Sequence, residues 1–261
     1  MNALDISAQA LLIAYLLILV PLAVVWYTEA PLKKRMGIAA GRMSLQLLLV
    51  ALYLKFLFDR DLWWLNALWI IVMIVAANDA IMRGAGIQGT RAFLTLLPGF
   101  ALGTLPILAL VLVLVLRPDP IWQARYLIPI MGMLLGNSLR SNIIGLERCY
   151  SSLGKCEEQY VAALMMGASR KEALRPFWTE SIVAALSPAV ASMATMGLVS
   201  LPGMMTGQIL GGSSPVLAIK YQIVIILAIL ASTALSVFTS LWLSRYTFFD
   251  SRDLLRRSLF R

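Results

Sequence analysis

The stretch AFLTLLPGFALGTLPILALVLVLVL, residues 92–116, contains no charged residue over 25 positions. An α-helix rises about 1.5 Å per residue, so these positions cover about 37 Å as a helix. The hydrocarbon core of a bilayer is about 30 Å thick, which this length crosses. The stretch therefore predicts a transmembrane helix.

Six further stretches have the length and apolarity of spans. The stretch 178–210, sixth of the seven in chain order, is long for one straight helix. It contains Pro188, Pro202 and Gly203, so we expect it to be kinked or broken. No Lys or Arg precedes the first stretch, which favours a retained span over a secretory signal. The seven predicted spans are residues 9–27, 38–58, 62–82, 92–116, 121–139, 178–210 and 216–243.

The composition supports the same class. Of the 261 residues, 60% are hydrophobic and 13% are charged, whereas a soluble domain carries about 25% charged residues. We therefore expect an all-α, polytopic integral membrane protein that forms one transmembrane domain over residues 1–261. The net charge is +9, but the chain offers no water-exposed domain surface that could carry a basic patch for nucleic acid. We therefore expect membrane lipid and no nucleic acid as a partner.

The Lys and Arg residues also predict an orientation, because they concentrate in short loops on the cytoplasmic side. If the N-terminus is outside, 17 of the 22 fall on the inner side and five on the outer side. This bias predicts a cytoplasmic C-terminus. Trp63 and Trp64 then lie at the outer interface, where indole rings are favoured.

The groups that enzymes need are scarce. The chain has no histidine, no G-x-x-x-x-G-K-[ST] phosphate loop and no G-x-S-x-G elbow. Asp79 and Glu180 fall near helix ends, so no carboxylate pair is expected at depth. Cys149 and Cys156 are expected to be reduced cytoplasmic thiols. We therefore predict no catalytic residue and no cofactor in this chain.

The most polar segment, about residues 146–176, ends in KCEEQYVAALMMGASRKEALRP. Glu157 begins a short amphipathic helix, Gly167 breaks it, Ser169 caps a second helix, and Pro176 marks the next span. Such a helix lies on lipid or docks in a groove of a soluble ATPase, and the sequence leaves both open. The candidate docking residues are Glu158, Tyr160, Ala162, Ala163, Leu164, Gly167, Ala168, Ser169 and Arg170.

The segment GLVSLPGMMTG, residues 197–207, combines a helix breaker with methionines. A broken helix in a membrane must be buried in protein or face water, so we expect a gate or pathway here, with a packing kink as the alternative. Methionines favour soft ions, but more often they only pack. The candidate path residues are Gln46, Asn137, Met196, Ser200, Pro202, Gly203, Met204, Met205 and Gln208, and no metal ligand is assigned.

The pair Gly132 and Gly136 forms a G-x-x-x-G pattern on the fifth span. Small residues at this spacing let helix backbones approach closely. We expect a packing role, within one protomer or between two.

Several motifs resemble a known family. VAALMMGASRKEA, residues 161–173, is similar to the EAA loop of ABC importer permeases, although Val161 replaces the usual glutamate and the later Leu-Pro is absent. GRMSLQL (41–47), IPIMGMLLGN (128–137), GLVSLPGMMTG (197–207) and AIKYQ (218–222) resemble the FetB-type permeases and their plant aluminium-tolerance relatives. This second resemblance covers nearly the whole chain.

The resemblance implies the membrane subunit of an ABC transporter in the bacterial inner membrane. It implies a homodimer, a separate soluble ATPase that binds ATP and Mg, and export of a metal ion such as iron. An ATPase-independent channel or carrier, and a membrane scaffold, are the alternatives. Only the ABC reading requires the docking helix within residues 157–175.

Overall fold

The computed structural model describes residues 7–250 and 253–260, and this part of the chain is helical apart from short loops and isolated bridges. The predicted all-α class is confirmed. The helices are α1 (Ala8–Tyr15), η1 (Leu16–Ile18), α2 (Leu19–Tyr27), α3 (Lys33–Arg60), α4 (Trp63–Gly84), α5 (Thr90–Leu110), η2 (Val111–Leu116), α6 (Ala124–Lys155), α7 (Glu157–Met165), α8 (Arg170–Thr195), α9 (Gly203–Leu210), α10 (Pro215–Thr247) and η3 (Arg257–Leu259).

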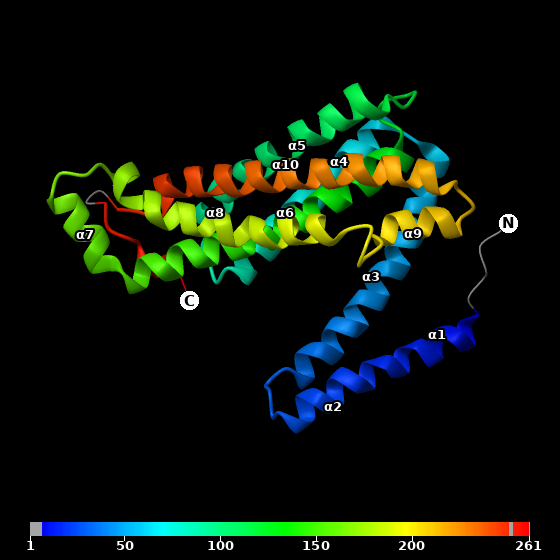
Figure 1. Ribbon diagram of the computed structural model, residues 1–261, viewed down its shortest axis with the longest axis horizontal. Coiled ribbons are helices and arrows are strands. Elements are labelled where there is room, and N and C mark those ends of the chain that lie inside the picture. The colour runs from blue at the N-terminus through cyan, green and yellow to red at the C-terminus, as the bar shows by residue number, and fades with distance from the viewer. Residues whose placement is uncertain (1–6, 251–252, 261) are drawn as a thin grey trace.

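Five long helices, α4, α5, α6, α8 and α10, form one bundle (Figure 1). Helix α7 and the C-terminal residues lie at one end of it, called the α7 end below. Helix α9 lies at the opposite end, called the α9 end. The buried apolar residues of this bundle form one large cluster that also includes Tyr160 of α7.

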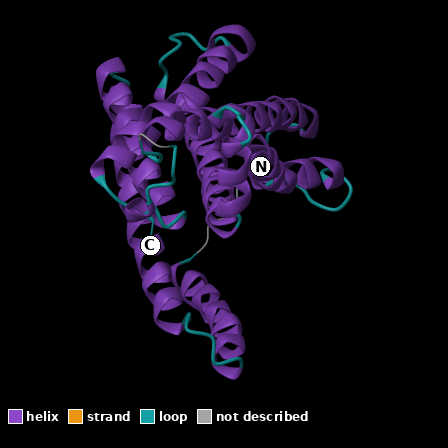
Figure 2. Ribbon diagram, turned by 90° about the vertical axis from the view of Figure 1, so that its left-hand side faces the viewer, coloured by secondary structure: helices purple, strands orange, loops and turns teal. Residues whose placement is uncertain are grey.

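The N-terminal hairpin of α1, α2 and α3 diverges from the bundle (Figures 1 and 2). Its apolar side chains are largely exposed, and Tyr15 forms a hydrogen bond with Ser44 across the hairpin. Apolar helices exposed on all sides require lipid as solvent.

Five helical stretches have the length and apolarity of spans: Gln9–Tyr27, Met36–Arg60, Trp63–Gly84, Thr90–Leu116 and Pro215–Thr247. They match five of the seven predicted spans. The other two belong to α6 and α8, whose charged residues, including Arg140, Glu147 and Arg148 on α6, lower their apolarity. The number seven stays a prediction.

The predicted sixth span is broken, as expected, but the break begins before Pro202. Helix α8 ends at Thr195, residues 196–202 are non-helical, and α9 starts at Gly203. Gly197 has φ +88°, a left-handed conformation that glycine adopts readily. Residues 178–210 therefore form two helices, not one span.

Ser169 caps a helix as predicted, but this helix does not end before Pro176. Helix α8 begins at Arg170 and continues through Pro176, so the predicted second short helix and the helix of the next span are one. Residues 146–155 also differ from the expected polar segment. They continue α6, with Leu146, Cys149 and Leu153 buried.

The closest helix contact lies between α5 and α10. A Cβ atom on Gly103 would stand 2.2 Å from the Ser236 Cα, and one on Gly99 would stand 3.0 Å from the Ser240 Cα. The predicted glycine pair on α6 does not do this within the chain. Within the described part of the chain, a Cβ atom on Gly132 would make an ordinary contact with Met73, and nothing lies within 4 Å of a Cβ atom on Gly136.

Three serines of α10, Ser232, Ser236 and Ser244, form hydrogen bonds with α6. Ser138 Oγ lies 3.2 Å from Ser232 Oγ, and Asn142 Nδ2 donates to Ser236 Oγ at 2.9 Å. Tyr150 donates its hydroxyl to Ser244. Hydrogen bonds between helices fix their register in an environment that offers little competing water.

Candidate functional site

Helix α7 has the local structure that the sequence predicts. Glu157 and Glu158 occupy its first turn, and Gly167 has φ +94° where the chain bends. Ser169 caps α8 and accepts from the Glu172 backbone, while the Glu172 carboxylate accepts from the Ser169 hydroxyl and N–H. These hydrogen bonds hold the pKa of Glu172 below its ordinary value.

The outward face of α7 is not the predicted one. Tyr160 is 1% exposed, and Ala163 and Leu164 pack against the main core. These three residues attach α7 to its own chain. The exposed apolar side chains are Met165 and Met166, at 85% and 82% exposure. Among the other predicted docking residues, Glu158, Ala162, Gly167 and Ser169 are exposed, and Ala168 and Arg170 are half-buried.

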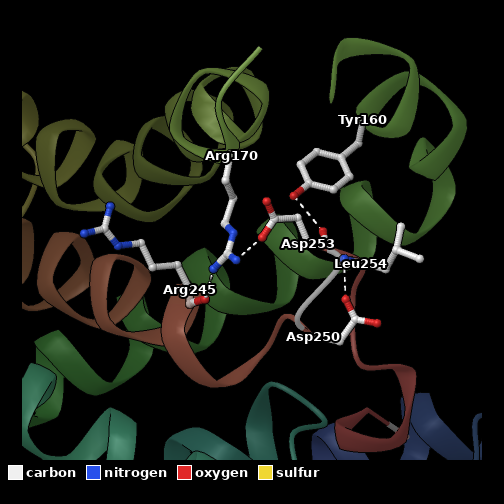
Figure 3. A network of polar contacts seen from close by, with 6 residues as sticks. All are labelled: Tyr160, Arg170, Arg245, Asp250, Asp253 and Leu254. Atoms are coloured by element: carbon white, nitrogen blue, oxygen red, sulfur yellow. Dashed lines mark hydrogen bonds and ion pairs between the residues drawn. The ribbon is translucent and has the colours of Figure 1, made fainter. Parts of the chain in front are cut away.

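A network of polar contacts attaches α7 to the segment after α10 (Figure 3). The Tyr160 hydroxyl donates to the Asp253 carbonyl at 2.9 Å, and Arg170 forms an ion pair with the Asp253 carboxylate. Arg170 also donates to the Arg245 carbonyl at 3.0 Å. Burial raises the pKa of Tyr160, and the nearby Arg170 charge opposes this shift.

The same C-terminal segment reaches two other helices. Phe260 stacks at 5.1 Å from Tyr150 of α6, and the Gln88 N–H donates to the Leu259 carbonyl at 2.8 Å. Arg257 forms an ion pair with Glu157 of α7. Residues 253–260 therefore join α7 to the rest of the α7 end. The sequence pattern was interpreted only through the positive charge of this segment, and its packing was missed. The aromatic residues Phe248, Phe249 and Phe260 lie among those charges and could have indicated that the segment packs against the helices.

The outward side of α7 borders a hollow of about 600 Å³. Its walls combine charged and apolar side chains, as in the polar rim and apolar centre of a protein interface. They are Gly154, Lys155, Glu157, Glu158, Val161, Ala162, Met165 and Arg257.

A second candidate site lies between α6, α8, α9 and α10. At the α9 end, a cavity of about 400 Å³ is lined by three methionines, and we call it the thioether cavity. Gln222 is 6% exposed and its Oε1 atom is buried with no hydrogen-bond partner in the described part of the chain. The lining residues are Met193, Met196, Gly197, Leu201, Pro202, Met205, Ile219, Gln222, Ile223, Ile226 and Leu227.

Nearer the α7 end lies a more polar cavity of about 250 Å³, which we call the hydroxyl cavity. Met193 and Ile226 line both cavities, so the two are neighbours, and we call them together the groove. From Ile219 to Thr233 it follows α10 for about 21 Å at 1.5 Å per residue. The hydroxyl cavity is lined by Asn137, Arg140, Ser141, Ile144, Pro188, Ala189, Ser192, Met193, Ile226, Ile229, Leu230 and Thr233.

The groove gathers some of the predicted path residues and not others. Asn137, Met196, Pro202 and Met205 line it. The described linings do not include Ser200, Gly203, Met204 or Gln208, and Met204 packs against the main core. Gln46 stands exposed on α3, which diverges from the bundle, and it is not among the described residues that line the groove, so its role in the path stays a prediction.

Hard-metal ligands do not converge in the described residues, which contain no group of three His, Cys, Asp or Glu side chains able to hold a metal ion. The groove instead presents thioethers, hydroxyls, amides and one guanidinium.

Comparison with known proteins identifies relatives along nearly the full length of the chain. It is 34% identical over 260 residues to the probable iron export permease protein FetB of Escherichia coli, covering 98% of this chain and 97% of that one. It is 35% identical over 211 residues to the membrane protein YjkA of Bacillus subtilis, covering 80% and 82%. The Arabidopsis thaliana protein ALUMINUM SENSITIVE 3 is 31% identical over 249 residues, covering 94% and 89%. No solved structure matches.

The apolar helices and these relatives make the chain a multi-pass inner-membrane protein. The resemblance to FetB-type permeases and their plant relatives is confirmed. Residues 8–249 match the uncharacterised protein family UPF0014, and the chain belongs to that family of membrane proteins.

Proposed function

We propose that this chain is the membrane subunit of an ABC transporter, driven by a separate soluble ATPase that binds ATP and Mg. The observation that carries the proposal is the outward face of α7, which holds Met165 and Met166 exposed beside a hollow. An exposed apolar helix face suits a groove in a protein partner. The names of the relatives, which include a permease, support transport as the function.

In this proposal the α7 end is cytoplasmic and the N-terminus is outside, as the charge bias predicts. Two copies of the chain assemble with two ATPase subunits. ATP binding closes the ATPases and moves α7. The C-terminal segment passes this motion to α10 through Asp253, because Tyr160 and Arg170 both contact it. The groove between α6, α8, α9 and α10 is half of the path, and a metal such as iron is the exported cargo.

The coupling surface is tested by co-purification with the candidate ATPase. The variant Met165→Asp with Met166→Asp places two charges on the proposed contact. Desolvating an unpaired charge costs several kcal/mol, so we expect capture of the ATPase to fall at least about tenfold.

Thr90→Asp is the matched control, because Thr90 is exposed at the α7 end and begins α5, where an acidic residue is favourable. Capture should stay at the parent level. Equal capture by all three proteins would mean that α7 lies on lipid. Metal export without any ATPase would favour an autonomous carrier.

The gate at residues 196–202 is tested separately by transport. Pro202→Ala with Gly203→Ala favours a continuous helix and should impair export while leaving ATPase capture intact. Met205→Leu should reduce export more than Met204→Leu, because Met205 lines the groove and Met204 packs in the core. Full export by the double variant would exclude the gate.

A further inference from the structure

The charge of the groove is carried by one residue, Arg140. Its guanidinium has no ion-pair or hydrogen-bond partner among the described residues, although it lines the hydroxyl cavity. Among the described residues, neither cavity lining contains an Asp or a Glu. The groove is therefore positive at one end and uncharged at the other.

Arg140 lies close to the boundary of the bilayer at the α7 end. Helix α4 has 22 residues, or about 33 Å, which is close to one hydrocarbon thickness. Its last residue, Gly84, packs directly against Ile143, and Arg140 lies three residues farther toward the α9 end. A charge at this depth requires an anionic partner or water.

The hydroxyl cavity offers further donors beside Arg140. Thr233 is 1% exposed and its Oγ1 atom has no hydrogen-bond partner in the described residues. Ser141 is 8% exposed and lines the same cavity. A buried hydroxyl without a partner costs free energy, and a ligand oxygen that accepts a hydrogen bond from it removes this cost. Guanidinium and hydroxyl donors together suit a carboxylate or a similar oxyanion.

The thioether cavity continues the groove with apolar walls. Met193, Met196 and Met205 are flexible and polarisable, which lets such a surface adapt to apolar ligands of different shape. The buried Gln222 is the polar exception, with an unpaired carbonyl oxygen that can accept one hydrogen bond.

We propose that the groove binds an amphipathic organic anion, with its charged group at Arg140 and Thr233 and its apolar part in the thioether cavity. The proposal deepens the function given above, because it names the class of cargo for the same path. A bare multivalent cation does not suit a groove that has a positive end and no carboxylate. A metal would pass as a complex with such an anion.

The test is photolabelling of the purified chain in phosphatidylcholine nanodiscs with dodecanoate that carries a diazirine on its tail. We expect the label on residues of the thioether cavity, such as Met193 and Ile223. Decanoate should compete and decyltrimethylammonium should not. Arg140→Gln should reduce labelling about tenfold or more, since hydrogen bonds to charged groups contribute at this level, and Arg140→Lys should retain much of it.

Arg91→Gln is the matched control, because Arg91 is also exposed at the α7 end with an unpaired guanidinium among the described residues. It should label like the parent protein. Equal loss in the Arg91 and Arg140 variants, or equal competition by the cationic amphiphile, would overturn the proposal.

Two further arms separate other occupants. Nanodiscs with phosphatidylglycerol test the lipid headgroup as the source of the anion. Competition by that lipid but not by decanoate would assign the groove to membrane lipid and overturn the proposal. Protection by Fe²⁺ alone would do the same. The ATPase is absent from the assay, so a failure here leaves the coupling proposal standing.

Discussion

The contact of α5 with α10 gives a quantitative prediction at Gly103. A methyl group added there would meet the backbone of Ser236 at 2.2 Å, whereas ordinary contacts begin at 3.4 Å. The two helices must therefore separate locally by about 1.2 Å, since a backbone cannot turn aside as a flexible side chain does.

Forcing an extra methyl into a close-packed contact costs about 1–3 kcal/mol. The separation also stretches the hydrogen bond from Thr239 Oγ1 to the Gly99 carbonyl, now 2.6 Å, which contributes about 1 kcal/mol. Replacing a glycine inside a helix by alanine stabilises the helix by about 0.5–1 kcal/mol, which offsets part of this cost. We expect Gly103→Ala to destabilise the protein by about 2 kcal/mol in sum.

Gly136→Ala is the matched control, because nothing lies within 4 Å of the added methyl. It should leave stability unchanged or raise it by up to about 1 kcal/mol. The measurement is unfolding of the purified protein in mixed micelles as the mole fraction of a denaturing detergent rises. If Gly103→Ala proves as stable as Gly136→Ala, the contact described here is wrong. If both destabilise, Gly136 packs against a second copy.

Three further outcomes concern the α7 end. Burial raises the pKa of the Cys149 thiol to about 12. Iodoacetamide at pH 8 should therefore modify half-buried Cys156 and spare Cys149 until the protein unfolds. Peptide mass spectrometry measures the two modifications. Ser169→Ala removes the cap of α8 and should lower stability by about 1 kcal/mol in the same micelle assay, with Ser169→Asp retaining most of it. The pKa of Glu172 is lower in the folded state than in the unfolded state. Its contribution to the free energy of unfolding should therefore be present above the unfolded pKa and disappear as the pH falls through the folded pKa. Glu172→Gln should abolish this pH dependence.

The sequence predicted much of the helix pattern because apolarity alone decides which segments enter lipid. It could not predict which glycine pair makes the close contact. Gly99 and Gly103 have the same spacing as Gly132 and Gly136, and the difference lies in the small serines opposite the first pair. The spacing of glycines along one helix does not predict which other helix packs against it.

For the candidate site, too, the sequence predicted local structure but not tertiary contacts. The sequence predicted a short amphipathic helix at α7 correctly, but an amphipathic pattern does not tell the inner face of a helix from its outer face. The chain's own tail supplies the partner for Tyr160, through a hydrogen bond between residues 93 positions apart. The break after α8 was predictable because proline and glycine act locally. The groove was not predictable, because four helices, α6, α8, α9 and α10, must come together to form it.

The attachment of α7 by residues 253–260 has a consequence for synthesis. Chains emerge at about 5–20 residues per second, so Asp253 appears about 5–19 s after Tyr160. Until then the aromatic ring of Tyr160 and the charge of Arg170 have no partner in the C-terminal segment. The proposed docking surface on α7 is therefore completed only after residues 253–260 have been made, and a chain translated only as far as α8 does not yet present it in finished form.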